Sequence, residues 1–195
     1  MVVRDPGADA RGPKRPDARI RLRAAWLLPL GAAAALVVTL HGAPGKASGT
    51  GVAAGMQAPL FRGVTIGGGA LSLAALRGRP VVLDFFTSWC AACRAEAPSL
   101  EALARQDAGR AAVVGVDMTV SEPSPAAVTS FARTYGVTFP IVLDRTGQIS
   151  DTYQVQTIPT LVFIDASGVV RGTASGDLSY SQMAAGIAPY LRGAS

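Results

Sequence analysis

The sequence reads Val81-Val82-Leu83-Asp84-Phe85-Phe86-Thr87-Ser88-Trp89-Cys90-Ala91-Ala92-Cys93 around its only two cysteines. The first six residues form an apolar run with one internal acid, which is typical of a central strand buried on both faces. We expect a helix to begin at Cys90. Its thiol would lie exposed at the helix N-terminus, where unpaired N–H groups and the helix dipole favour a thiolate. Cys93, one turn further on, would lie beneath it and close enough to form a disulfide, so the spacing predicts a redox-active dithiol.

Two other uses of the cysteine pair explain the sequence less well. A structural zinc site needs four ligands, whereas the pair supplies two and the only histidine, His41, lies far away in the chain. A purely structural disulfide would stabilise little, because its effect grows with loop length and this loop is minimal. We therefore expect redox chemistry with no metal and with no cofactor other than the Cys90–Cys93 disulfide itself.

The positive charge of the chain is concentrated at its N-terminus. The 195 residues carry a net charge of +5, of which residues 1–41 contribute +4. The rest of the chain is nearly neutral, so no basic face indicates binding to nucleic acid. The length suits one domain with an appendage.

An uncharged apolar segment of 17 residues follows the basic stretch, at 24–40. This length is the lower end of the ~17–25 residues that cross a bilayer as a helix. Because Arg19, Arg21 and Arg23 precede it, the positive-inside rule places the N-terminus in the cytoplasm and the domain outside. Trp26 suits the membrane interface. The segment is therefore predicted to be a single-pass membrane anchor.

A cleaved secretory signal is the alternative interpretation of the same segment, and it would release a secreted protein. The long N-terminal region and the weak cleavage sites favour a retained anchor. Either interpretation places the domain outside the cytoplasm, where disulfides persist. We expect a monomer with four parts: a basic disordered segment 1–23, an anchor 24–40, a flexible linker 41–54 and a folded domain 55–195.

Strands and helices alternate along the domain. We expect strands at 61–66, 70–73, 81–86, 111–117, 139–143, 160–165 and 169–174, and helices at 73–77, 90–106, 124–135, 147–153 and 179–191. Ser124-Pro125 would open its helix and Gly136 would end it. Parallel strands joined by helices, and closed by an antiparallel hairpin, predict an α/β fold: a central mixed β-sheet flanked by helices on both faces.

Further motifs accompany the cysteine pair. Trp89 directly precedes it, Pro98 follows it on the expected helix, and Ile158-Pro159 comes later in the chain. The segments Gly55–Phe61, Phe139–Asp144, Tyr153–Thr160 and Phe163–Gly168 belong to the same pattern. From about Val52 to Leu191 the chain resembles thioredoxin-fold proteins of the membrane-tethered, extracytoplasmic TlpA/ResA type. This resemblance implies a thioredoxin-like three-layer fold with an N-terminal hairpin and a helical insertion.

The two cysteines and three residues near them have expected roles. Cys90 would be the nucleophile that forms a mixed disulfide with substrate, and Cys93 would resolve it. Trp89 resembles the family's exposed aromatic residue beside the active site, and a core tryptophan is its alternative. The resemblance implies that Pro159 is a cis-proline facing the dithiol, with Ile158 lining the same substrate groove.

Two acids complete the candidate site. A carboxylate inside an apolar strand is costly without a partner, and the thioredoxin resemblance gives Asp84 the role of a buried acid that exchanges protons with Cys93. A solvent-facing acid at a strand end is the alternative. Glu96 matches an acid common in the family three residues after the second cysteine, and a solvated helix residue is its alternative.

The expected function is reduction or exchange of protein disulfides outside the cytoplasm. The resemblance implies reduction of protein disulfides, including those of apocytochrome c before haem attachment, with electrons exchanged through a membrane-embedded thiol protein. A disulfide-forming oxidase for secreted proteins stays open, because Ala91-Ala92 does not reveal the direction of electron flow. A peroxiredoxin, suggested by Thr87, and a Cu(I) chaperone using both thiolates are weaker alternatives, since each lacks a further residue that its chemistry needs.

Overall fold

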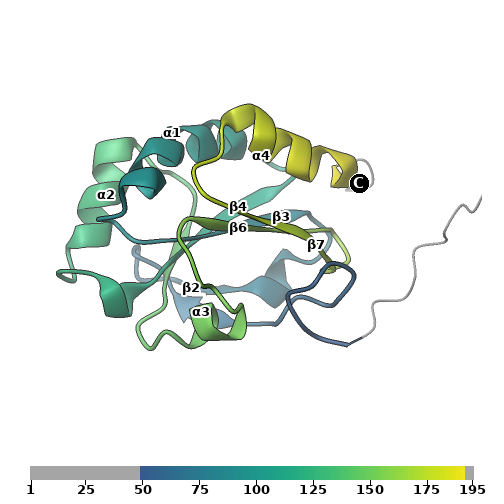
Figure 1. The fold of residues 1–195 in the computed structure, drawn as a ribbon, viewed down its shortest axis with the longest axis horizontal. Helices are drawn as coiled ribbons and strands as arrows, with labels where there is room; N and C mark the ends of the chain where they lie inside the picture. Colours follow the sequence, from purple (N-terminus) through teal and green to yellow (C-terminus); the bar gives the residue numbers. More distant parts are fainter. Residues whose placement is uncertain (1–48, 192–195) are drawn as a thin grey trace, which may run out of the picture. The chain divides into compact units, whose positions relative to one another are not determined.

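The computed structural model describes residues 49–191, and its centre is a five-stranded mixed sheet (Figure 1). The central strand is paired in parallel with one neighbour and antiparallel with the other. The order across the sheet is β5 (Ile141–Leu143), β4 (Ala112–Asp117), β3 (Val81–Phe86), β6 (Thr160–Ile164) and β7 (Val170–Ser175). The α/β fold with a mixed sheet is therefore confirmed.

Strand β3 is buried along its whole length, as its apolar run predicts. Because side chains alternate across a sheet, Val82 and Phe86 pack into the core on one face, whereas Leu83 and Phe85 pack into the core on the other. Asp84 shares the face of Val82 and Phe86 by the same alternation. The one acid of the strand therefore points into the layer that contains the cysteines.

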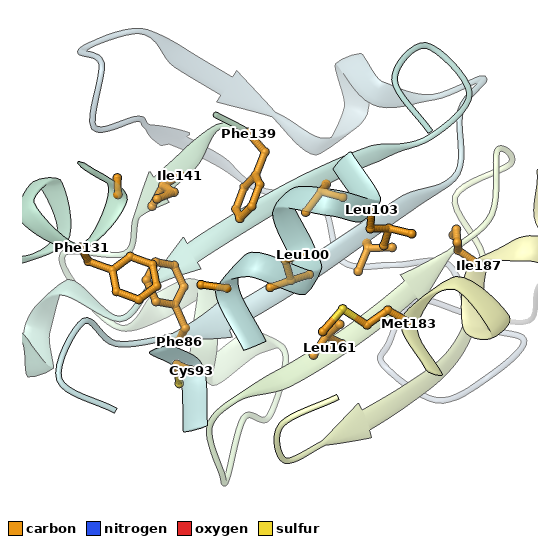
Figure 2. Packing of buried hydrophobic residues seen from close by; sticks show 14 of the residues in the cluster. Phe86, Cys93, Leu100, Leu103, Phe131, Phe139, Ile141, Leu161, Met183 and Ile187 are labelled. Atoms are coloured by element: carbon orange, nitrogen blue, oxygen red, sulfur yellow. The ribbon is translucent and has the colours of Figure 1, made fainter. Parts of the chain in front are cut away.

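Three helices cover that face of the sheet: α1 (Ala91–Gln106), α2 (Ala127–Tyr135) and α4 (Tyr180–Ile187). Figure 2 shows Leu100 and Leu103 of α1 packed with Met183 and Ile187 of α4, with Leu161 of the sheet beneath them. Since α1 begins immediately after β3, this packing fixes the place at which the cysteines emerge.

The opposite face is covered by a hairpin and a short helix (Figure 1). The hairpin pairs β1 (Arg62–Val64) with β2 (Ala70–Ser72), and the helix is α3 (Gln148–Thr152). Tyr153, which follows α3, packs against Phe85 and donates a hydrogen bond from its hydroxyl to the Pro59 carbonyl at 2.7 Å. A 3₁₀ turn, η1 (Leu73–Leu76), follows β2, as predicted. Helices on both faces are therefore confirmed.

Several element boundaries differ from those predicted, and three of the differences have a local cause. Helix α2 begins at Ala127, because Ser124 uses its carbonyl in a turn that accepts the Ala127 N–H at 3.1 Å. The last helix ends at Ile187 and continues as the 3₁₀ turn η3 (Ala188–Tyr190), since Pro189 has no N–H to extend an α-helix. Strand β5 starts only after Pro140. The predicted end of α2 at Gly136 is correct, and its φ of 65° suits glycine.

The predicted segments 1–23 and 24–40 lie outside the described residues, as does most of the linker 41–54. Within residues 49–191, none of the helices has the length and apolar character needed to traverse a bilayer. Gly55, where the folded domain was predicted to begin, donates its N–H to the Val170 carbonyl of β7 at 2.8 Å.

Candidate active site

The two cysteines lie at the N-terminus of α1 and form a disulfide. Cys90 is the N-cap residue, and its Sγ accepts a hydrogen bond from the Cys93 N–H at 3.2 Å. Their Cα atoms are 5.3 Å apart. The predicted placement of the pair at a helix N-terminus is correct. An N–H group that points at Cys90 Sγ is the interaction that stabilises a thiolate there.

The expected exposure of Cys90 is wrong: only 8 % of the residue is accessible, against 2 % for Cys93. The reason is a loop far away in the sequence, since Cys90 Sγ lies 4.0 Å from the Ile158 carbonyl oxygen. The peptide bond from Ile158 to Pro159 in this loop is cis. Pro159 is buried, and its carbonyl accepts the Gly176 N–H at 3.0 Å. The structure thus brings Ile158 and Pro159 to the cysteine pair.

Trp89 is 51 % exposed, so its interpretation as a core tryptophan is wrong. Its indole N–H donates to the Ser121 carbonyl at 2.9 Å, which holds the ring on the surface beside the cysteines. A groove of about 200 Å³ runs between this ring and the loop of the cis-proline. Its lining residues carry no charge: Thr87, Trp89, Met118, Ser121, Val155, Gln156, Thr157 and Ile158.

Asp84 and Glu96 are both buried, at 4 % and 2 % exposure, so neither is a solvated surface acid. Their carboxyl groups are close enough for the protonation of each to affect the pKa of the other. Burial, followed by the nearby Glu96 charge, raises the pKa of Asp84 well above its usual value. Burial likewise raises the pKa of Glu96 to about 7, although the Leu178 N–H, which donates to Glu96 Oε2 at 3.2 Å, opposes the shift. A pair of this kind holds one proton near neutral pH.

The position of this carboxyl pair relates it to Cys93. Glu96 follows Cys93 by three residues on α1, so the two side chains lie on the same face of the helix. Asp84 lies on the face of β3 that this helix covers. The pair therefore belongs to the layer of the fold that contains Cys93.

A second group of polar residues near the cysteines was not predicted. The Glu122 carboxylate accepts hydrogen bonds from both the backbone N–H and the hydroxyl of Ser88, two residues before Cys90. Glu122 follows the 3₁₀ turn η2 (Thr119–Ser121), which comes directly after β4. One feature could have indicated this contact. β3 and β4 are adjacent parallel strands, so the residues that follow the two strands meet at one edge of the sheet.

Comparisons with known proteins show the family of this chain. Residues 54–173 match the AhpC/TSA family. Thioredoxin-like protein YneN of Bacillus subtilis (strain 168) is 38 % identical over 133 residues, which are 68 % of this chain and 78 % of that protein. Thiol-disulfide oxidoreductase ResA of Geobacillus kaustophilus is 34 % identical over 161 residues, covering 83 % and 90 %.

A solved structure is similar over the same region. It is a secreted Mycobacterium tuberculosis disulfide oxidoreductase homologous to Escherichia coli DsbE, with a TM-score of 0.61 and 30 % identity over 66 % of this chain and 95 % of that one. The predicted resemblance to ResA proteins is confirmed. The chain belongs to the AhpC/TSA family and is a ResA-related thiol–disulfide oxidoreductase with a thioredoxin-like fold.

Proposed function

We propose that this protein is held at the outer face of the cell membrane by residues 24–40 and reduces disulfide bonds in other proteins, apocytochrome c among them. One observation carries the proposal: the Cys90–Cys93 pair caps α1 beside an uncharged groove, between an exposed tryptophan and the loop of a cis-proline. A groove without charged side chains suits an extended protein segment that presents a disulfide. The similarity to ResA supports the same activity.

The reaction begins with the reduced dithiol. The Cys90 thiolate attacks one sulfur of the substrate disulfide, the substrate S–S bond breaks, and its departing sulfur takes up a proton. Cys93 then attacks Cys90 Sγ, which forms the Cys90–Cys93 disulfide and releases the second substrate thiol. Two electrons have passed from protein to substrate. A membrane-embedded thiol protein returns them by reducing the Cys90–Cys93 disulfide in the same way.

Asp84 and Glu96 serve the second step. Cys93 must lose its proton before it attacks, and Cys93 is 2 % exposed, so water reaches it poorly. The buried carboxyl pair accepts that proton and returns it when the disulfide is next reduced. Trp89 and Ile158 contact the bound substrate, and Pro159 shapes the loop that faces it.

The cysteine variants test this assignment. Cys90→Ser should abolish reduction of insulin disulfides, whereas Cys93→Ser should accumulate mixed disulfides with substrate, since it cannot resolve them. If Cys93 proves to be the thiol more sensitive to alkylation at neutral pH, the assigned roles are reversed.

The direction of electron flow is tested by the reduction potential of a fragment that starts near Gly49. A potential near −270 mV would indicate a reductant, whereas one near −120 mV would indicate a disulfide-forming oxidase.

The location is tested with a phosphatase fused after Ser195. The fusion should be active, since the proposal places the C-terminus outside the cytoplasm. An intact N-terminus recovered in washed membranes would support the anchor. A mature chain that begins near Ser48 or Thr50 would instead establish a cleaved signal.

A further inference from the structure

The segment after β4 binds the loop that carries the cysteines. Glu122 accepts the Ser88 N–H, at 2.5 Å, and the Ser88 hydroxyl. The residue before it, Ser121, accepts the Trp89 indole N–H. Two consecutive residues of one loop therefore hold the two consecutive residues that precede Cys90.

Ser88 is fixed through all of its polar groups. Its N–H and hydroxyl are taken by Glu122, and its carbonyl accepts a hydrogen bond from Arg94 Nε at 2.8 Å. Because Ser88 is also buried, it cannot exchange these partners for water. The backbone that leads into Trp89 and Cys90 thus has one conformation as long as Glu122 is in place.

A buried acid lies beside Glu122. Asp117, at the end of β4, is inaccessible to solvent, and the nearby Glu122 charge contributes to raising the pKa of Asp117. Burial raises the pKa of Asp117 to about 8, against the opposing effect of the Thr119 hydroxyl, which donates to Asp117 Oδ2 at 2.7 Å. Burial therefore favours the neutral form of Asp117 beside the Glu122 carboxylate, so that Asp117 does not repel Glu122 from Ser88.

We propose that Glu122 is a positioning residue for substrate binding: its carboxylate holds Ser88 and thereby sets the Trp89 ring at the edge of the groove beside Cys90. The inference rests on the proposed function, since the groove is taken as the substrate site. Glu122 acts through Ser88 and Trp89 and does not touch the reacting sulfurs.

The chain contains a matched control. Glu101 in α1 accepts the N–H and the hydroxyl of Thr138, each at 2.7 Å, so it binds one hydroxyl residue as Glu122 does. It is also buried. Glu101 lies 11 residues beyond Cys90 on the helix, roughly 16 Å along the axis. Its loss should reduce stability without affecting the groove.

The experiment uses the full chain, purified in detergent, with Trp26→Phe as background. The chain has two tryptophans, so fluorescence then reports on Trp89 alone. Glu122→Ala should raise the KM for insulin reduction about tenfold with little change in kcat, and acrylamide should quench Trp89 more strongly. Glu122→Gln should restore both properties to within about threefold of the parent, because an amide can still accept the Ser88 N–H and donate to its hydroxyl.

The control variants decide the outcome. Glu101→Ala should lower the urea midpoint but leave KM and Trp89 quenching unchanged. If Glu122→Ala changes neither property more than Glu101→Ala does, the proposal is overturned. If the parent reduces no insulin, the proposed function fails, yet Trp89 quenching in the same variants still tests the positioning, since it requires no substrate.

Discussion

At the scale of single residues, the fold removes two carboxyl groups near the cysteine pair from water. Asp84 and Glu96 lie close together in the layer of the fold that contains Cys93, and both have raised pKa values because burial penalises their charged forms. Among residues 49–191, Asp84 Oδ1 and Glu96 Oε1 accept no hydrogen bond. Such a pair remains poised to exchange a proton in the pH range where thiols react.

Asp84→Asn should slow the resolution of a mixed disulfide roughly tenfold near neutral pH, since an amide cannot accept the Cys93 proton. The loss should shrink towards about pH 9, where Cys93 deprotonates without help. Stopped-flow measurement of resolution across this range checks the expectation. The fold should persist, because a neutral amide of similar shape replaces a buried acid. Resolution rates that match the wild type at every pH would remove Asp84 from the reaction.

At the scale of elements, helix α4 connects the packing of the core to the site. Its N-terminus has a capping box: Ser179 Oγ accepts the Gln182 N–H, and Gln182 Oε1 accepts the Ser179 N–H. The residue directly before it, Leu178, supplies the N–H that binds Glu96. The start of α4 therefore helps to hold one member of the carboxyl pair.

Ser179→Ala should reduce the free energy of unfolding by about 1 kcal/mol, because the first turn of α4 loses its side-chain cap. Urea denaturation followed by circular dichroism measures this. Ser130→Ala is the matched control, since Ser130 is exposed within α2 and alanine is at least as favourable in a helix interior. Equal midpoints for the two variants would show that the capping box contributes nothing.

At the scale of the whole molecule, three buried acids with raised pKa values make stability depend on pH. In the folded state Asp84 is shifted well above its usual value, Glu96 to about 7 and Asp117 to about 8. Unfolded, such acids titrate near 4. Between about pH 4 and 8 the folded state therefore binds more protons than the unfolded state, so the free energy of unfolding falls as pH rises. The stabilisation from Glu96 and Asp117 is complete below about pH 4 and is lost as the pH rises through about 7 and 8, respectively.

The urea midpoint of the fragment from Gly49 should accordingly be higher at about pH 5 than at about pH 8. Asp117→Asn should flatten this dependence, because it removes a group that ionises between about pH 4 and 8. The nearby Glu122 and Asp144 charges contribute to raising the pKa of that group. Asp151→Asn, a change at an exposed acid of α3, should leave the slope as it is. A midpoint that rises from pH 5 to pH 8 would contradict the assignment of these acids.

Local patterns were sufficient to predict the elements of the fold. The apolar run at β3, the helix that begins at the cysteines, the glycine end of α2 and the β6–β7 hairpin all follow from neighbouring residues, whose burial and backbone preferences act over a few positions. The placement of the cysteine pair at a helix N-terminus needed no more than that. The start of α2 was wrong because Ser124 and Pro125 suit a turn as well as a cap.

Contacts between distant segments could not be read from local patterns. Cys90 is covered by Ile158, Asp84 is paired with Glu96, and Ser88 is bound by Glu122. Cys90 meets Ile158 because β6 is antiparallel to β3, which brings the loop before β6 to the end of β3. Ser88 meets Glu122 because β3 and β4 are parallel and the residues after both strands lie at one edge of the sheet. Asp84 and Glu96 come together because α1 packs on the face of β3 that carries Asp84. The burial of a carboxyl group, and therefore its pKa, depends on these contacts between segments. The local sequence thus identifies the candidate reactive residues. Only the tertiary structure determines their accessibility and proton affinity, because both depend on burial by other segments of the chain.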